Sequence, residues 1–514
     1  MEKFVLSKEH KEKRAQKKHF ILRDDIIGSG QLQMELTPDD YCGVYFNIPN
    51  QVDKVIIDGM YAGDWYSMYE SQILPYRRMP MVARWRSQGR DLFGEWIKNV
   101  HDKGKECWLT HRVSEVQVGV KHNPVHIIDE HPEWFLDLPC SNCKTQNYAI
   151  PEIREHQICI LKEVMNKYDF DGLDIDFERH TPILPVGKQW EMRDCITDFM
   201  RKLREITLKI GEEQGRVVML SARIPDCIKG CHIDGLDIET WIKEDLVDCL
   251  TLGSRSFDIK VEEFRALSDE IQIYGCYDPH HTVDGYLFPT IETIRAVWYA
   301  HLQRGADGVE YFNWSGEGDS ELIEKVKKHV FNYGLDGDMF FYYLSQANDD
   351  FTGANDKDFL EKQNKTYVID RKGGYPWGVG YGNLNADRQL PCKIENDGEV
   401  FLYVAENAGL AKQTTLKLLF EELKEIPQIY FNGRKIDGFI ANPHRDLQVT
   451  NEEIAPISGS TISIRLANGV DMSKPCTLLT AFVTGLETKV GYNSLKVITK
   501  TPVSLEKVEL EVNR

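Results

Sequence analysis

Three acidic residues alternate with apolar ones in a short stretch of the chain, "DGLDIDFE" at residues 171–178. Asp174, Asp176 and Glu178 fall at every second position, so in a strand their side chains project to the same face. Three carboxylates this close cannot all ionise cheaply, and one of them should have a raised pKa and keep its proton near neutral pH. A carboxylic acid beside an ionised carboxylate is the pair that cleaves glycosidic bonds. The spacing therefore predicts a glycoside hydrolase site.

The position of each acid along the strand predicts its role. Glu178 is nearest the strand end and has the longest stem, so we expect it to be the proton donor. Asp176 would orient Glu178 or polarise a substrate group, and the deeper Asp174 would tune Asp176. Two alternatives remain open at this stage: the acids are neutralised by arginines such as Arg223, or Asp174 and Asp176 hold a divalent cation, which prefers oxygen ligands.

The elements that must position these acids recur along residues 19–335. Apolar strand-like runs alternate with longer amphipathic stretches, as in βα units. The runs are "HFILRDD" (19–25), "KVIIDG" (54–59), "ECWLTHR" (106–112), "GLDIDFE" (172–178), "RVVMLSAR" (216–223), "VDCLTLGS" (247–254), "IQIYGCYDP" (271–279) and "GVEYFNW" (308–314). Because polar residues gather where the runs end, we predict a (β/α)8 TIM barrel whose site lies at the C-terminal ends of its strands.

The same strand ends supply candidates for binding the substrate. A second carboxylate would come from Asp25, Asp58, Asp278 or Glu310, and the Trp314 indole could stack on a pyranose ring. The guanidinium groups of Arg112 and Arg223 could hold an acidic or sulfated sugar, or only neutralise the acids. The full set of predicted substrate-binding residues is Asp25, Asp58, His111, Arg112, Arg223, Asp278, Glu310, Asn313 and Trp314.

The chain changes character after residue 335. Residues 336–385 are rich in turns and aromatic residues, and we expect them to form a connector packed on the barrel. From residue 386 to 514, alternating runs separated by turn residues predict an antiparallel β-sandwich of the jelly-roll kind. We expect this domain to be a fixed accessory domain or the platform of a homo-oligomer.

The composition of the chain limits which classes of partner and which compartment are expected. A net charge of −19 disfavours nucleic acid and anionic membrane surfaces as partners. No stretch of 18 apolar residues occurs, and the basic, polar start "MEKFVLSKEHKEKRAQKKHF" does not resemble a secretory signal. Scattered cysteines favour a reducing compartment, so we expect a cytoplasmic protein. We expect neither a cofactor nor a metal site.

Two resemblances support this interpretation. "DGLDIDFE" resembles the Asp-Gly-x-Asp-x-Asp-x-Glu strand motif of family 18 chitinases. In that family the last glutamate, here Glu178, is the acid, and the aspartate at the position of Asp176 assists a substrate acetamido group. A wider set of segments, including "HFILRDDIIG", "THRVSEVQ", "HPEWFLD" and "RGADGVEYFNW", resembles the glycosyl-hydrolase-like 10 group. That resemblance implies a (β/α)8 barrel with a C-terminal β-sandwich and hydrolysis of a glycan.

We therefore expect a glycoside hydrolase acting on an oligo- or polysaccharide, with Glu178, Asp176 and Asp174 as the catalytic residues. Two other functions stay open. One is a catalytically silent glycan-binding protein, which would have no need of Asp176 and Glu178 together. The other is a metal-dependent carbohydrate esterase, which would lose activity to chelators.

Overall fold

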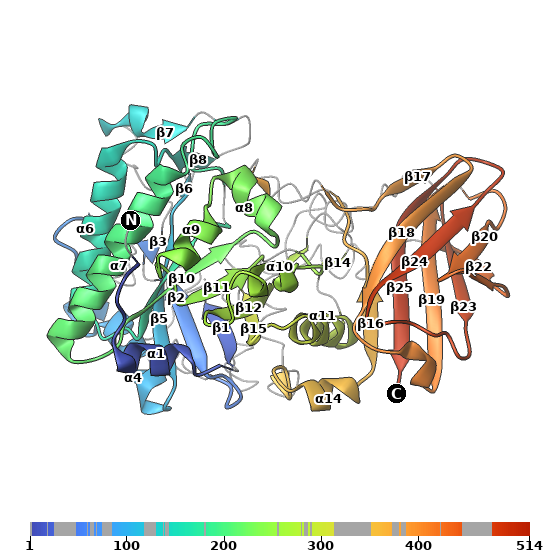
Figure 1. The fold of residues 1–514 in the computed structure, drawn as a ribbon, viewed down its shortest axis with the longest axis horizontal. Coiled ribbons are helices and arrows are strands. Elements are labelled where there is room, and N and C mark those ends of the chain that lie inside the picture. Colours follow the sequence, from blue (N-terminus) through green and yellow to red (C-terminus); the bar gives the residue numbers. More distant parts are fainter. Residues whose placement is uncertain are drawn as a thin grey trace.

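A computed structural model gives the fold of the chain (Figure 1). It describes residues 3–17, 19–24, 48–58, 60–61, 66–67, 69–74, 85–117, 130–136, 138, 143–178, 181–253, 256–278, 280–281, 286–287, 290–312, 351–372, 380–381, 387–421, 423–444 and 475–514.

Eight parallel strands close into a barrel. In order around the barrel they are β1 (Phe20–Asp24), β15 (Gly308–Phe312), β12 (Gln272–Tyr277), β11 (Cys249–Leu252), β10 (Met219–Ile224), β9 (Gly172–Asp176), β5 (Glu106–Arg112) and β2 (Lys54–Asp58). Each predicted strand-like run coincides with one of these strands, and β10 extends one residue beyond its run, so the predicted barrel is confirmed. Their apolar composition suits strands buried on both faces. The motif glycine, Gly172, has a packing reason as well, because a Cβ there would lie 2.5 Å from the Trp108 ring.

Helices cover the outside of the barrel (Figure 1). In α6, the helix before β9, apolar residues such as Ile153, Leu161 and Val164 are buried, and Pro151 occupies the first turn. The helix after β9 ends at Gly215, whose positive φ suits a C-terminal cap. The helices are α1 (Lys8–Arg14), α4 (Leu92–Asp102), α6 (Pro151–Lys167), α7 (Asp194–Gln214), α8 (Ile228–Asp234), α9 (Ile238–Lys243), α10 (Val261–Arg265), α11 (Ile291–Gln303) and α14 (Lys357–Glu361).

Short antiparallel strands extend the loops of the barrel. They are β3 (Met60–Tyr61), β4 (Tyr66–Ser67), β6 (Glu115–Gln117), β7 (Phe135–Leu136), β8 (Cys143–Gln146), β13 (His280–His281) and β14 (Tyr286–Leu287). They pair as β3 with β4, as β13 with β14, and as the three-stranded sheet β6-β8-β7.

Two antiparallel sheets form the C-terminal part, as predicted. The larger contains β16 (Lys365–Val368), β25 (Val503–Asn513), β19 (Gln413–Glu421), β23 (Cys476–Phe482) and β22 (Ile440–His444), with β17 (Cys392–Ile394) paired to β25. The smaller contains β18 (Asp397–Val404), β24 (Gly491–Ile498), β20 (Gln428–Phe431) and β21 (Arg434–Ile436). Because β16 pairs with β25, the first strand of these sheets lies inside residues 336–385, the range expected to be a connector.

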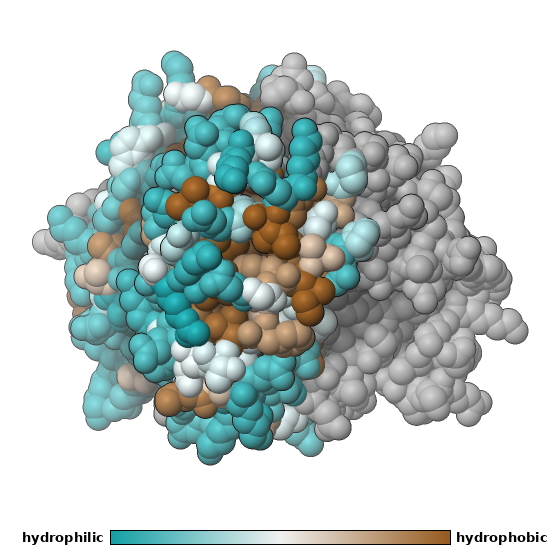
Figure 2. All heavy atoms as spheres, turned by 90° about the vertical axis from the view of Figure 1, so that its right-hand side faces the viewer, coloured by the Kyte–Doolittle hydropathy of each residue, from teal (hydrophilic) through white to brown (hydrophobic). Residues whose placement is uncertain are grey.

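The sheets lie beside the barrel, and α11 stands between the two (Figure 1). The Tyr492 hydroxyl of β24 donates a hydrogen bond to Asp258, which follows β11, over 2.8 Å. At the sandwich end of the molecule, apolar side chains gather between charged ones (Figure 2). In the described part of the sandwich, Ile440 and Phe482 are 52% and 63% exposed. No helix among the described residues is long and apolar enough to cross a membrane.

Candidate active site

The three acids of the sequence motif lie together at the end of β9. Asp174 and Asp176 belong to the strand, and Glu178 follows it by two residues. All three are buried, with exposed fractions of 0%, 1% and 4%. Ser221 and Arg223 on β10 are register partners of the two aspartates, and Thr110 and Arg112 are their partners on β5. The barrel register therefore determines which side chains can contact each acid.

Asp174 is bound in the barrel interior by residues from three other strands. Arg23 donates to Asp174 Oδ2 over 2.7 Å, and the Thr110 hydroxyl donates to the same oxygen over 2.9 Å. The Ser221 hydroxyl donates to Oδ1 over 2.6 Å. Arg23 also binds Glu310, with 2.8 Å between Nε and Oε1. Asp174 and Glu310 are thus two carboxylates that share one buried guanidinium.

Asp176 is held as an anion by a different arginine. Arg223 Nη2 lies 2.6 Å from Asp176 Oδ2, and the Glu178 backbone N–H donates to Oδ1 over 2.9 Å. Burial alone would raise the pKa of Asp176, but the positive charges of Arg223 and Arg23 outweigh burial and hold that pKa well below its usual range. Asp176 therefore stays ionised across the physiological pH range.

Glu178 has the opposite environment. Burial raises its pKa from the ordinary 4.5 to about 8, because the nearby negative charges of Asp234, Asp226 and Asp176 add to burial while Arg223 opposes it. Among the described residues, Glu178 Oε1 is buried without a hydrogen-bond partner. Glu178 is consequently protonated near neutral pH and lies two residues from an ionised aspartate, so the two carboxyl groups differ in protonation.

The predicted substrate-binding residues separate into three groups. Arg112 lies between two carboxylates, with Nε 3.9 Å from Asp58 Oδ2 and 4.0 Å from Asp176 Oδ2. His111 is buried, which lowers its pKa to about 4, so it is neutral. The structure thus brings Asp58, Arg112 and Arg223 to the Asp176 site.

The second group is fully buried, and the third lies outside the described residues. Glu310 is fully buried and accepts hydrogen bonds from Arg23, Thr251 and Cys276. Asp278 follows β12 and is also fully buried. Asp25, Asn313 and Trp314 lie outside the described residues.

Four residues important to this site were missed by the sequence reasoning. Arg23 is a charged residue within an apolar strand, and that contrast was the available signal for it. Asp226, Asp234 and Arg388 follow no recognisable spacing. Only the tertiary structure brings the two aspartates near Glu178 and pairs Arg388 with Asp226. Within the part of the chain that the structure describes, no group of three His, Cys, Asp or Glu is placed to hold a metal ion.

Part of the chain is similar to a known protein family. The profile of the glycosyl hydrolase-like 10 family matches residues 50–188. The expected resemblance to this group is confirmed over that range, which contains β2, β5, β9 and all three acids of the motif. No curated protein matches the chain.

Several solved structures are similar to the chain at low sequence identity. One is a cycloisomaltooligosaccharide glucanotransferase of Paenibacillus sp., with 10% identity, a TM-score of 0.34 and coverage of 96% of this chain and 57% of that one. Another is α-L-fucosidase isoenzyme 2 of Paenibacillus thiaminolyticus, with 13% identity, a TM-score of 0.39 and coverage of 68% and 51%. A third is the PgaB (BpsB) glycoside hydrolase domain of Bordetella bronchiseptica, with 10% identity, a TM-score of 0.37 and coverage of 64% and 99%. The chain thus spans little more than half of the first two structures.

Proposed function

We propose that this protein is a glycoside hydrolase that cleaves a glycosidic bond in an oligo- or polysaccharide, with Glu178 as the general acid. One observation carries the proposal: a buried carboxylic acid with a pKa of about 8 lies beside a carboxylate kept ionised by an arginine. The match of residues 50–188 to a glycosyl-hydrolase-like family supports the same function.

In the reaction, Glu178 would donate its proton to the glycosidic oxygen as the bond to the anomeric carbon breaks. The electron pair of that bond leaves with the departing sugar, and positive charge develops on the remaining sugar ring until a water oxygen bonds to the anomeric carbon and releases a proton. Asp176 would stabilise this charge or polarise a substrate group beside the anomeric carbon. Arg223 and the Glu178 N–H fix the orientation of Asp176, so it need not reorganise during the reaction.

The other buried acids divide between structure and catalysis. We assign Asp174 and Glu310 a structural role, because Arg23 binds both of them inside the barrel. Asp58 is the described candidate for a further carboxylate that acts on the substrate, because Arg112 connects it with Asp176.

The test is a panel of aryl glycosides and natural oligosaccharides assayed at several pH values with the wild type and with Glu178→Gln. We expect the variant to lose about 10²- to 10⁴-fold in kcat on substrates with poor leaving groups, which is the usual contribution of a general acid. Glu213→Gln, on the exposed side of α7, is the matched control and should retain wild-type rates. Near wild-type turnover by Glu178→Gln would contradict the assignment of the acid.

Two results would point to the other functions. Measurable sugar binding without turnover of any substrate would identify a silent glycan-binding protein. Deacetylation of a sugar that stops after treatment with a chelator would identify a metal-dependent esterase.

A further inference from the structure

Residues that follow the barrel in the sequence lie against the segment just after Glu178. The Gly380 N–H donates to the backbone oxygen of Thr181, three residues after Glu178, over 2.9 Å. A Cβ on Gly380 would lie 1.7 Å from Thr181 Oγ1, so the approach requires glycine. This contact joins residues almost two hundred positions apart at the edge of the site.

The next residue binds a buried carboxylate at the end of α8. The Tyr381 N–H donates to both oxygens of Asp234, over 3.0 and 3.2 Å. Asp234 is only 2% exposed. The Tyr381 ring covers Gly230 of the same helix, where a Cβ would lie 2.5 Å from the ring. Tyr381 and α8 therefore fit closely, with Asp234 held between them.

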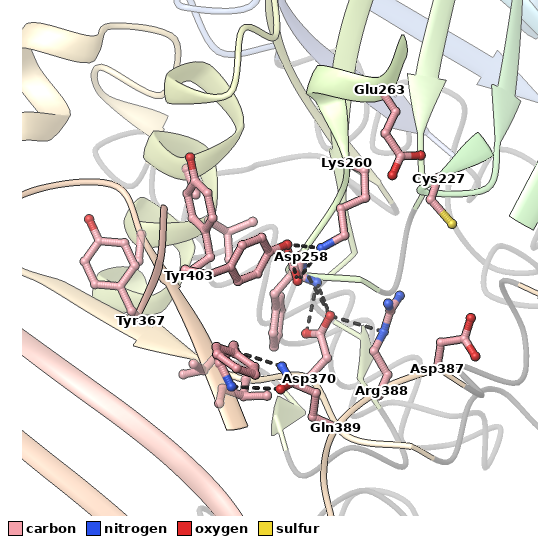
Figure 3. Close-up of a pocket in the computed structure, with 18 of the residues that line it drawn as sticks. Cys227, Asp258, Lys260, Glu263, Tyr367, Asp370, Asp387, Arg388, Gln389 and Tyr403 are labelled. Atoms are coloured by element: carbon pink, nitrogen blue, oxygen red, sulfur yellow. Dashed lines mark hydrogen bonds and ion pairs between the residues drawn. The ribbon is translucent and has the colours of Figure 1, made fainter. Parts of the chain in front are cut away.

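A second buried carboxylate receives its cation from the same part of the chain. Arg388 Nη2 forms an ion pair with Asp226, which follows β10, and donates to the Ser256 hydroxyl over 2.7 Å. On its other side, Arg388 Nε lies 3.3 Å from Asp370, just after β16 (Figure 3). Arg388 thus connects the loops after β10 and β11 with the sandwich.

These contacts form part of the wall of a cavity of about 570 Å³ between the barrel and the sandwich. Its charged groups have protein partners: Asp258 binds Lys260 and Tyr492, and Asp387 binds Lys229. Among the described residues, these charges along the wall therefore organise the protein itself.

The two carboxylates held in this way act on the acid, and Asp234 also contacts the segment after it: the Thr181 hydroxyl, three residues after Glu178, lies 3.5 Å from Asp234 Oδ2. The negative charges of Asp234 and Asp226 both raise the pKa of Glu178, as does Asp176 on β9, and Arg223 on β10 opposes them. Burial raises the pKa of Asp234 itself to about 7, against the hydrogen bonds from Tyr381 and Thr181. The Cys231 thiol of α8 is a further titratable group near Glu178, because the charge of Glu178 contributes to raising the pKa of that thiol.

We propose that Gly380, Tyr381 and Arg388 are positioning residues that fix Asp226 and Asp234 beside Glu178, so that the C-terminal part of the chain completes the active site. The proposal rests on the proposed role of Glu178 as the acid. It implies that the sandwich is docked on the barrel for catalysis as well as for stability.

The test is the pH dependence of kcat/KM in variants that remove either the cation or one of the anions. The basic limb of this profile, where kcat/KM falls as the pH rises, reports the pKa of Glu178. Arg388→Met leaves Asp226 without the cation that holds it in place. The effect of the Asp226 anion on the pKa of Glu178 should weaken, so the basic limb of the profile should move down by about one pH unit, whereas Arg388→Lys should restore it. Asp234→Asn removes an anion and should move the limb down by a similar amount. Tyr492→Phe, which weakens another contact between the sheets and the barrel, is the matched control and should leave the limb in place.

A purely structural role would lower activity without moving the limb. Equal profiles in Arg388→Met and Tyr492→Phe would therefore overturn the proposal. If Arg388→Met does not fold, Asp234→Asn provides the test. An unchanged basic limb in that variant would also overturn the proposal.

A second measurement separates this proposal from the proposed function. If the wild type cleaves no glycoside, the proposed function fails. Thermal unfolding then tests whether Asp234 is positioned to act on Glu178. Glu178→Gln should raise the thermal midpoint at about pH 9, and this gain should shrink in an Asp234→Asn background and persist in a Tyr492→Phe background. The same gain in both backgrounds would show that Asp234 does not act on Glu178.

Discussion

Replacing Glu178 with glutamine should change how the stability of the protein depends on pH. The folded protein raises the pKa of Glu178 from the ordinary 4.5 to about 8, so folding favours the protonated form. The stability associated with this proton is fully present below about pH 4.5 and is lost as the pH rises through about 8. Glutamine has the same shape and cannot ionise, so the variant avoids that loss.

The size of the effect follows from the pKa change. Each pKa unit corresponds to about 1.4 kcal/mol, so ionising Glu178 should cost the wild type up to about 5 kcal/mol at alkaline pH. For a barrel of this size, 1 kcal/mol corresponds to about 2 °C in the thermal midpoint. Relative to wild type, Glu178→Gln should therefore gain up to about 10 °C between about pH 5 and pH 9.

The assay is thermal unfolding of wild type, Glu178→Gln and the exposed control Glu213→Gln across this pH range. Asp234 titrates in all three proteins, so its contribution largely cancels in the comparison. The control should follow the wild type at every pH. Parallel curves for wild type and Glu178→Gln would refute the conclusion that the acid is protonated in the folded protein near neutral pH.

Three further predictions concern the residues around the acid. Asp174→Asn should lower the thermal midpoint at all pH values, because it weakens the buried pairing of Arg23 and costs about 3–5 kcal/mol; an unchanged midpoint would contradict the structural role of Asp174. Asp176→Asn should reduce kcat and move the basic limb of the kcat/KM profile down, because an anion that raises the pKa of Glu178 is removed; a limb that moves up would contradict this. Limited proteolysis should give no rapid, clean cut within residues 351–372, because Phe351 and Leu360 are buried; early release of two stable pieces there would show a flexible tether instead.

The sequence was sufficient to predict the barrel because each strand has a local signature. Strands buried on both faces must be apolar along their length, and a glycine stop separates several of them from the preceding helix. The same locality explains why Asp176 and Glu178 could be expected close together, since Asp176 ends β9 and Glu178 follows two residues later. Their proximity follows from their spacing in the chain, whichever residues surround them.

The surroundings of the acids depend on contacts distant in sequence. Arg23 reaches Asp174 from 151 residues away, and Arg388 reaches Asp226 from 162 residues away. No periodicity in a single chain relates such pairs. Asp174 was accordingly expected to tune Asp176, whereas the structure shows it bound to Arg23 on another strand. The start of the sandwich was also placed too late, because β16 is short and lies among turn-rich segments.

The distribution of cations over the carboxylates explains which acid keeps a proton. Asp174 and Glu310 share Arg23, Asp176 pairs with Arg223, and Asp226 pairs with Arg388. Within the described part of the chain, Glu178 forms no ion pair of its own, and its Oε1 has no hydrogen-bond donor.

A buried carboxyl in that position lowers its free energy by binding a proton, since burial disfavours its charge and the neighbouring anions repel it. Proton donation then depends as much on the arginines that bind the other acids as on Glu178 itself. Two of those three arginines belong to barrel strands, but Arg388 comes from beyond the barrel. A barrel domain expressed alone should therefore retain Asp174, Asp176 and Glu178 but lack Arg388. The surrounding charges that determine the pKa of Glu178 would then differ from those in the full chain.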